Sequence, residues 1–499
     1  MFKRSAGVLL HITSLPSSYG NGTLGKEAYE FVDFLSKAGQ KYWQILPIGP
    51  TDGPISNCPY SSFSTHAGNP YLIDLETLKN DGLLEKNEYT NLNWGDNPEW
   101  IDYDKICNLK LCLLEKAYVN SKNFSQKKFE EFIDKNREWL EDYALYMALK
   151  EHFSQPNWRK WPEKDIAQRE PESMKYYRQK LEDRLYFFMY TQFLFFTQWK
   201  KFKKYANDHG ILLIGDIPIY VSMGSADTWA NSKVFWFDKQ GDPVCVGGCP
   251  PDQFSDEGQL WNAPLYNWDY LAKTDYSWWV NRFKSAISLF DVTRIDHFRA
   301  FHSYYAIQYL AKDAINGEWL KGPGMKFFEV LKEKFGNIPL IAEDFGGPYE
   351  EGVKKLLKDT GCPGMKILQY AFDFSCDNEN IPHNYDKNSV VYTGNHDNDT
   401  ISGWLASAAP APVSRAKVYS LLSKEEGYNW GLIRLAYSSV SDLAIIPVQD
   451  FLNLGTKSRM NIPGTIENNW RWKLKDFSKI FAMADKIYNL SKIYGRVER

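Results

Sequence analysis

Four acidic residues follow or close short apolar runs, an arrangement that could act on a glycosidic bond. They are Asp216 in GDIPIYV, Asp296 in TRIDHFRAF, Glu343 in IAEDFG and Asp397 in TGNHDNDT. A strand that ends in a carboxylate, repeated along one chain, is what a parallel barrel needs to gather acids at a single mouth. Two carboxyl groups that flank an acetal oxygen are the minimum equipment for breaking and remaking a glycosidic bond.

Eight apolar runs rich in β-branched residues could supply the strands of such a barrel. Their continuous rather than alternating hydrophobicity is typical of parallel strands that helices cover on both sides. Helical patterns such as 26–39 and 317–336 lie between them, the latter broken by Gly-Pro-Gly, and this alternation predicts βα units. The fold class predicted is therefore α/β, a (β/α)8 TIM barrel. The eight runs are 6–12, 42–48, 210–217, 290–296, 338–344, 364–372, 389–395 and 443–450.

Two insertions are expected within a single catalytic barrel that spans residues 1–499. The interval between the second and third runs is too long for one crossover, and its Lys, Glu, Leu and aromatic residues predict a largely helical insertion subdomain at 55–205. After the third run, residues 222–270 are rich in Gly, Pro, Asp and Trp. We expect this stretch to be an irregular, loop-rich insertion that forms an active-site lid, because long βα loops lie at the catalytic face.

The composition indicates a neutral or mildly polar substrate. Lys and Arg number 59 and Asp and Glu 62, so a formal net charge of -3 gives no basic field for nucleic acid or an anionic membrane. Aromatic residues make up 16% of the chain, including 18 Trp. Although most of these rings should pack in the core, some could serve as platforms for sugar rings.

Seven cysteines, an odd number, suit a reducing compartment and imply no disulfide framework. Cys245 and Cys249 are too isolated from other Cys and His to complete a zinc site, so we expect no metal. The N-terminal MFKRSAGVLLHITSL is interpreted as the first strand because no cleavage-site pattern follows it. No stretch approaches the ~20 apolar residues of a membrane span. We therefore expect a cytoplasmic protein without membrane partners.

Taken together, the motifs resemble one family from near one end of the chain to the other. The chain is similar to the amylomaltases, the 4-α-glucanotransferases of glycoside hydrolase family 77 in the α-amylase clan. No single string would suffice, but seven strings in the family's order are specific. They are PYSSFSTHAGNPYLIDL at 59–75, GDIPIYV, GGCPPDQFSDEGQLWNAPLY at 247–266, RIDHFRAF, AEDFG, GNHDNDT and RMNIPGTIENNWRW at 459–472.

The resemblance implies that Asp296 is the catalytic nucleophile, Glu343 the acid/base and Asp397 a third catalytic carboxylate that grips sugar hydroxyls. The implied activity is transfer of α-1,4-glucan segments between maltooligosaccharides, without a cofactor, through a covalent glucosyl-enzyme intermediate. Physical chemistry accepts these roles, since exchange of one α-1,4 bond for another retains configuration and a double displacement achieves this.

Four expectations about geometry and protonation follow. Arg294, two residues before Asp296, should point to the same side of its strand and keep Asp296 ionised, unless the pair is merely structural. The carboxyl groups of Asp296 and Glu343 should lie about 5–5.5 Å apart. Burial and neighbouring carboxylates should raise the pKa of Glu343. Asp344 should face the opposite way.

Substrate-binding roles are expected for six residues: Tyr60, Asp216, Gln259, Trp261, Arg294 and His396. A lone histidine is more often a packed core residue, but next to Asp397 in a strand-end loop His396 is expected to contact the ligand. Asp216 could either touch substrate or support the site. Three residues depart from the small or apolar residues expected in these motifs: Cys58, His66 and Cys249.

Alternative functions stay open. An α-glucan hydrolase or a branching enzyme of the same clan would carry identical carboxylates and differ in how well its loops exclude water. A catalytically silent glycan-binding or scaffold protein would be expected to lose Asp296 or Glu343, and both are present. A metal- or phosphate-dependent barrel enzyme would need a P-loop or a His-rich cluster, and the sequence has neither.

Overall fold

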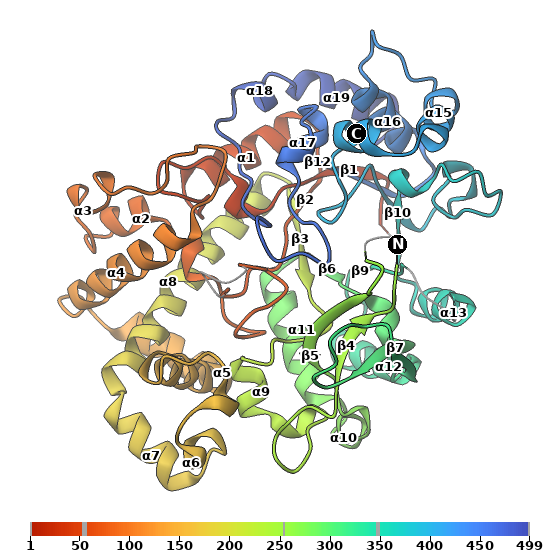
Figure 1. The fold of residues 1–499 in the computed structure, drawn as a ribbon. Coiled ribbons are helices and arrows are strands. Elements are labelled where there is room, and N and C mark those ends of the chain that lie inside the picture. The colour runs from red at the N-terminus through yellow and green to blue at the C-terminus, as the bar shows by residue number, and fades with distance from the viewer. Residues whose placement is uncertain (1, 52–56, 253–254, 346–349, 498–499) are drawn as a thin grey trace.

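The computed structural model describes residues 2–51, 57–252, 255–345 and 350–497. The first positions of the predicted 55–205 insertion, residues 253–254 of the predicted lid and Gly346 of the AEDFG motif lie outside the described residues. Figure 1 shows a central barrel with a block of helices against one side.

Eight parallel strands close into a barrel, which confirms the predicted fold class. Each strand overlaps one of the eight predicted runs. The order around the barrel is β1-β12-β11-β10-β9-β6-β3-β2, and the first and last strands close it in a register that pairs Ser5 with Leu443. The strands are β1 (Ser5–Leu9), β2 (Tyr42–Gln44), β3 (Leu212–Ile217), β6 (Val292–Ile295), β9 (Leu340–Ala342), β10 (Gly364–Ile367), β11 (Ser389–Tyr392) and β12 (Leu443–Pro447).

Amphipathic helices cover the outside of the barrel (Figure 1). In the first of them, α1, Phe31, Val32 and Leu35 are buried while the opposite face carries charge. This burial explains why the strands are apolar on both sides. The remaining helices that follow barrel strands are α11 (Ser277–Leu289), α12 (Met325–Phe335), α13 (Glu350–Thr360), α14 (Ile401–Ser407), α15 (Pro410–Tyr419), α16 (Tyr428–Ser438), α17 (Val448–Phe451), α18 (Ser478–Phe481) and α19 (Ala484–Ile493), and α1 itself is Lys26–Lys37.

The chain between β2 and β3 forms the block of helices beside the barrel (Figure 1). Its helices are α2 (Leu75–Asn80), α3 (Asn87–Thr90), α4 (Tyr103–Ser121), α5 (Lys127–His152), α6 (Lys164–Ala167), α7 (Pro171–Lys180) and α8 (Glu182–Asp208). Buried glutamines on α8 fix the incoming chain, since Gln192 exchanges two hydrogen bonds with the backbone of Gly68 and Gln198 does the same with Asp74. In the described part of the chain, no helix has the length and apolarity needed to cross a lipid bilayer.

A second, four-stranded antiparallel sheet lies beyond the ends of β3 and β6. Its order is β5-β4-β7-β8, built from β4 (Cys245–Cys249), β5 (Gln259–Pro264), β7 (Ser303–Gln308) and β8 (Gly317–Lys321). Two short helices, α9 (Ala226–Ala230) and α10 (Trp268–Lys273), flank β4 and β5 in the chain. The stretch 222–270 therefore contains regular strands where the sequence predicted irregular loops.

The predicted helix at 317–336 is wrong over its first residues, which form β8. Trp319 lies opposite Tyr305 of β7, the preceding strand in the chain, with ring centroids 5.3 Å apart, so antiparallel pairing with that strand overrides the local helical pattern. Helix α12 begins only at Met325, after Gly324 adopts a positive φ of 64°.

Candidate active site

Arg294 lies at the centre of a carboxylate cluster at the C-terminal ends of three neighbouring strands. Its guanidinium is fully buried and donates hydrogen bonds to Asp216 Oδ2 at 2.6 Å and Asp296 Oδ1 at 3.0 Å. Its Nη2 also forms an ion pair with Glu343 Oε1 at 2.7 Å. The carboxylates come from β3, from the residue after β6 and from the residue after β9. Parallel strand order thus brings together side chains that lie far apart in the sequence.

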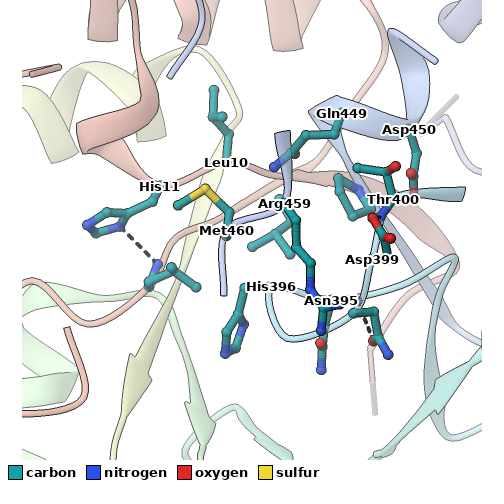
Figure 2. A pocket seen from close by; sticks show the side chains of 14 residues that line it. Leu10, His11, Asn395, His396, Asp399, Thr400, Gln449, Asp450, Arg459 and Met460 are labelled. Atoms are coloured by element: carbon teal, nitrogen blue, oxygen red, sulfur yellow. Dashed lines mark hydrogen bonds between the residues drawn. The ribbon is translucent and has the colours of Figure 1, made fainter. Parts of the chain in front are cut away.

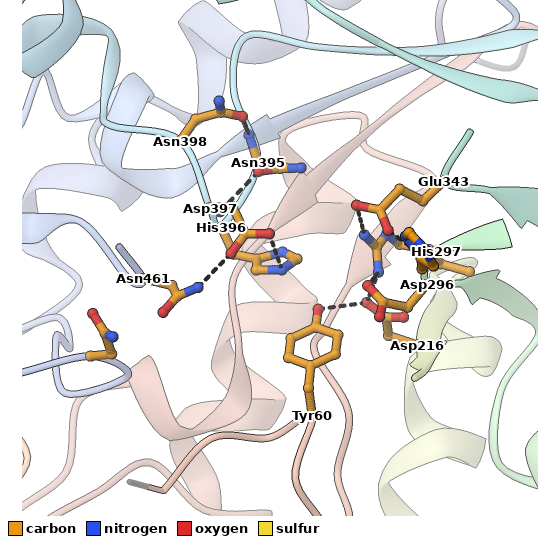
Figure 3. Close-up of polar contacts among 12 residues, drawn as sticks. Tyr60, Asp216, Asp296, His297, Glu343, Asn395, His396, Asp397, Asn398 and Asn461 are labelled. Atoms are coloured by element: carbon orange, nitrogen blue, oxygen red, sulfur yellow. Dashed lines mark hydrogen bonds and ion pairs between the residues drawn. The ribbon is translucent and has the colours of Figure 1, made fainter. Parts of the chain in front are cut away.

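Asp397 lies across from this cluster, in the loop after β11 (Figure 3). Its Oδ1 accepts a hydrogen bond from Asn461 Nδ2 at 2.6 Å, and its Oδ2 lies 3.3 Å from His396 Nε2. The loop is held by its own side chains: Asn395 Oδ1 accepts from the Asp397 N–H, and Asn398 Oδ1 accepts from the Asn395 N–H. The run of Asn and Asp in GNHDNDT therefore folds the backbone that presents Asp397.

Tyr60 connects the two halves of the site (Figure 3). Its ring stacks on His396 with centroids 5.2 Å apart, and its hydroxyl donates to Asp216 Oδ2 at 2.8 Å. The side chain of Asp216 has no exposed surface and is held by Tyr60 and Arg294. Those of Asp296, Glu343 and Asp397 are 24%, 16% and 30% exposed. The three carboxylates expected to be catalytic are therefore the ones open to a ligand.

The expected upward pKa shift of Glu343 is wrong. Burial would raise the pKa of Glu343, but the Arg294 cation and a hydrogen bond from the backbone N–H of His297 outweigh burial and hold it below its ordinary value. The pKa values of two other carboxyls in the cluster are raised. Burial raises the pKa of Asp216, and the pKa of Asp296 lies well above its ordinary value because of burial and then the negative charge of Glu343. Arg294 does contact Asp296, as expected, but the expectation that it keeps Asp296 ionised is wrong, because the cation is shared with two other acids.

Asp397 is held ionised by its neighbours. Burial alone would raise its pKa, but the electrostatic interaction with His396 and hydrogen bonds from His396 and Asn461 lower it to about 2. An ionised carboxylate accepts hydrogen bonds only, so Asp397 is suited to receive sugar hydroxyls.

The strand β5 brings Gln259 and Trp261 to the site through His297. Trp261 Nε1 donates to Gln259 Oε1 at 3.2 Å, and Gln259 Nε2 donates to Asp252 at 2.8 Å. The Trp261 ring meets the His297 ring edge-on, with centroids 4.9 Å apart. Since the His297 N–H donates to Glu343, His297 connects the tryptophan to that acid.

Behind His396 lies a small cavity of about 20 Å³, which is about the space one water molecule needs. Figure 2 shows His11, His396, Arg459 and Met460 around it. The Nδ1 of His11 accepts a hydrogen bond from the Leu46 N–H at 3.2 Å, and burial followed by the proximity of His396 lowers the pKa of His11 to about 3. His11 is therefore neutral at pH 7.

Three residues of the site had no role assigned from the sequence: His297, Arg459 and Asn461. Arg459 donates to the carbonyl oxygens of Asp397 and Asn461, and Asn461 bonds the Asp397 carboxylate. The signal was present, because both lie in RMNIPGTIENNWRW. His297 adopts a left-handed conformation with φ 48°, which turns its N–H toward Glu343, and nothing in the local sequence indicates that turn.

The three residues that depart from the expected motifs all have structural surroundings that explain them. Burial raises the pKa of the Cys58 thiol to about 12. Cys249 Sγ lies 3.7 Å from Asp252 Oδ2, beside the bond from Gln259. His66 Nδ1 lies 2.7 Å from Ser285 Oγ, away from the carboxylates.

Comparison with known proteins gives one consistent likeness. A family model described as 4-alpha-glucanotransferase matches residues 10–479. The 4-alpha-glucanotransferase of Clostridium butyricum is 49% identical over 491 residues, which cover 98% of this chain and 100% of that one. That of Streptococcus pneumoniae is 43% identical over 502 residues, covering 100% and 98%. The solved amylomaltase from Streptococcus agalactiae in complex with acarbose superposes with a TM-score of 0.96 at 40% identity, covering 99% of this chain and 100% of that one.

Proposed function

Because the chain belongs to the 4-alpha-glucanotransferase family, glycoside hydrolase family 77, we propose that it transfers α-1,4-glucan segments between maltooligosaccharides by a retaining double displacement. One observation carries the proposed mechanism. Asp296 and Glu343 contact the same buried guanidinium at 3.0 Å and 2.7 Å, so both carboxyl groups face one small volume. A retaining mechanism needs its two carboxyl groups close together.

In the first half-reaction the Asp296 carboxylate attacks the anomeric carbon of the donor, and the bond from that carbon to the glycosidic oxygen breaks. Glu343 gives its proton to the departing oxygen, which leaves as the 4-hydroxyl of the released glucan. The products are a glucosyl ester on Asp296 and an ionised Glu343. Arg294 contacts both carboxylates and offsets the charge that moves between them.

In the second half-reaction the 4-hydroxyl of an acceptor glucan attacks the same carbon. Glu343 takes the hydroxyl proton, the ester bond to Asp296 breaks, and a new α-1,4 bond forms. The two displacements together retain the configuration. The reaction involves no oxidation or reduction, and carboxyl groups act as both the nucleophile and the acid/base. An assay of the reaction therefore needs no added metal or cofactor.

The proton must move within the pair when substrate binds. In the free site the raised pKa of Asp296 and the lowered pKa of Glu343 favour the proton on Asp296. A sugar against Glu343 removes water from that carboxyl and brings an oxygen that accepts its hydrogen bond, and both effects favour the protonated form of Glu343. We propose that donor binding itself places the proton where the first step needs it.

The surrounding residues would hold the reacting sugar. Tyr60 supplies a ring face, and His396 and Asp397 supply hydrogen-bond partners to its hydroxyls, contacts that strengthen as the oxocarbenium-like state forms. Asp216 is fully buried, so we propose that it acts by fixing Tyr60 and Arg294. Trp261 and Gln259 would cover the acceptor side as the lid. The acarbose complex of the Streptococcus agalactiae amylomaltase supports an oligosaccharide ligand.

Incubation of the pure protein with maltotriose, without metal or cofactor, tests the proposed reaction. A ladder of longer maltooligosaccharides should appear with free glucose and little net gain in reducing ends, because each broken bond is remade. If reducing ends rose in step with donor loss, the reaction would be hydrolysis rather than transfer. Products with 1,6 linkages would indicate a branching enzyme instead.

A further inference from the structure

A second cavity, of about 990 Å³, lies outside the barrel between the helical block and α11. Helices α5 and α8 form one wall, and α9 and α11 form the other (Figure 1). Its volume is at the upper end of the range of about 300–1,000 Å³ that is usual for ligand pockets. None of the residues given a catalytic or substrate-binding role above lines it.

The wall formed by α5 and α8 carries aromatic side chains among charged ones. Phe132, Trp139, Phe193 and Phe196 all line the cavity and are all only half-buried. Trp139 and Phe196 lie with ring centroids 5.9 Å apart, and Phe132 and Phe196 lie 5.8 Å apart, so the rings form a continuous surface. A contiguous set of large rings left open in this way marks a binding site rather than a core.

The wall formed by α11 is polar. Asn281, Lys284, Ser285 and Ser288 recur at the spacing of one helix face, and all four line the cavity. They supply amide, ammonium and hydroxyl groups that can donate or accept hydrogen bonds. A solvated outer helix of a barrel would show the same face, but here that face lies across a cavity from an aromatic wall.

Some of the charges at the cavity are paired. Lys204 forms an ion pair with Asp208 at 2.6 Å, Lys203 with Asp291 at 3.4 Å, and Asp142 with Arg169 at 2.7 Å. The lining therefore offers a ligand flat apolar surface on one side and amide, hydroxyl and ammonium groups on the other. A pyranose ring has the matching form, with C–H groups on its faces and hydroxyls on its rim.

We propose that this cavity is a second saccharide-binding site, which takes a short segment of α-1,4-glucan. The segment stacks on Trp139 and Phe196 and bonds the polar face of α11. This site is separate from the proposed catalytic centre but adjoins it structurally. Ser64, His66 and Leu289 line both this cavity and a smaller one of about 60 Å³ that reaches Tyr60 and Asp216.

His66 connects the proposed saccharide site to the catalytic centre. Its ring stacks on Trp139 with centroids 6.0 Å apart, its Nδ1 bonds Ser285 of α11, and it lies six residues after Tyr60. It thus joins the aromatic wall, the polar wall and the segment that enters the catalytic centre. Its function for a long donor is tethering, because a chain held at one site meets the other at a raised effective concentration.

Titration calorimetry with maltoheptaose tests the proposal in an Asp296→Asn background, in which turnover does not consume the ligand. The Asp296→Asn protein should show two binding events per chain. Addition of Trp139→Ala should remove one of them, and Trp139→Phe should restore it because the platform is kept. Trp236→Ala, at an exposed tryptophan outside the cavity, is the matched control and should leave both.

A single binding event in the Asp296→Asn protein would overturn the proposal, as would a second event that survives Trp139→Ala. If Trp139→Ala does not fold, Asn281→Ala with Ser288→Ala decides the question, because both are exposed helical positions that tolerate alanine. Loss of the second event at high salt would overturn the assignment to a neutral saccharide. In the active protein, Trp139→Ala should lower kcat/KM for amylose relative to that for maltotriose by about threefold to tenfold.

Discussion

At the scale of single residues, Arg294 determines the electrostatics of the site. One guanidinium contacts three carboxylates, and it is buried too deeply for water to neutralise the excess negative charge. Burial, followed by this excess negative charge, therefore holds the pKa of Asp296 well above its ordinary value. Because Asp296 and Glu343 interact so closely, their protonation belongs to the pair, and its position responds to what lies between them.

Asp296→Asn and Glu343→Gln should fail in different ways. An amide cannot act as a nucleophile, so Asp296→Asn should lower kcat by about 10⁴-fold or more while the protein stays folded. Glu343→Gln lacks only the proton donor and acceptor. With a glycosyl fluoride, whose leaving group needs no acid, it should accumulate a glucosyl ester on Asp296 that intact-mass spectrometry detects. Absence of the adduct in an otherwise inactive Glu343→Gln protein would count against a covalent route.

His11 should make the protein sensitive to acid. Its folded-state pKa of about 3 lies below its ordinary 6.5, so the unfolded chain binds more protons between these values and stability falls as the pH drops below 6.5. Each pH unit costs about 1.4 kcal/mol, or roughly 2–3 kcal/mol near pH 4.5. His11→Asn keeps an acceptor for the Leu46 N–H but cannot take a proton.

The Tm of the His11→Asn protein should therefore fall less than the Tm of the parent when the pH falls from about 7 to about 4.5. His383→Asn, at an exposed histidine, is the control and should follow the parent. Parallel melting curves for parent and His11→Asn would show that the protonation of His11 does not limit stability.

The sequence was sufficient to place the acids but not to describe their protonation. Asp296, Glu343 and Asp397 could be located because each ends an apolar run, and strand order alone brings such ends together. The pKa direction of Glu343 was missed because it depends on a shared arginine and on the left-handed turn at His297. Asn461 was missed as a partner of Asp397 because it arrives from 64 positions along the chain.

At the scale of elements, we propose that β5 covers the site. Trp261 and Gln259 lie on the same face of this strand, and the link from Trp261 through His297 to Glu343 couples the strand to the proposed acid. Trp261 lies in a bulge of β5, where the pairing with β4 passes from Leu260 to Ala263. We therefore expect β5 to determine how well water is excluded from the glucosyl ester.

Trp261→Ala should raise the share of hydrolysis. The truncation opens the acceptor side to water, so more reducing ends should form for each maltotriose consumed, with a smaller change in total donor loss. Trp236→Ala is a close control, because both tryptophans are 37% exposed. An unchanged ratio of hydrolysis to transfer in Trp261→Ala would show that β5 does not control water exclusion.

The barrel strands were predictable, and the second sheet was not. The runs for β11 and β12 are buried along their whole length, so local hydrophobicity identifies them. By contrast, β8 is largely exposed and β5 half-exposed, and each becomes a strand by pairing with the strand that precedes it in the chain. A pattern read in one window contains no information about that partner.

At the scale of the whole molecule, Arg496 fastens the end of the described chain to the start of the barrel. It is 1% exposed and donates to the carbonyl oxygens of Ser5, Ala436, Tyr437, Ser439, Ser441 and Asp442. These carbonyls lie around the junction of β1 and β12, where the barrel closes. One side chain thus satisfies the backbone on both sides of the seam.

Arg496→Met should destabilise the protein strongly. It leaves several buried carbonyl oxygens without a donor, at a cost of about 3–5 kcal/mol in the free energy of unfolding. Arg137→Met is the control, since Arg137 is 59% exposed and its loss should change stability by no more than about 0.5 kcal/mol. Thermal melts that match for the two variants would show that the seam does not depend on Arg496.

The same seam has a consequence for synthesis on the ribosome. Arg496 bonds Ser5 across 491 positions, and β1 cannot pair with β12 until nearly the whole chain has emerged. At roughly 5–20 residues per second this takes about 25–100 s, during which the apolar strand β1 has one edge unpaired. An unpaired apolar strand invites pairing with other nascent chains. Slow translation late in the message should therefore lower the yield of folded protein more than slow translation early in it.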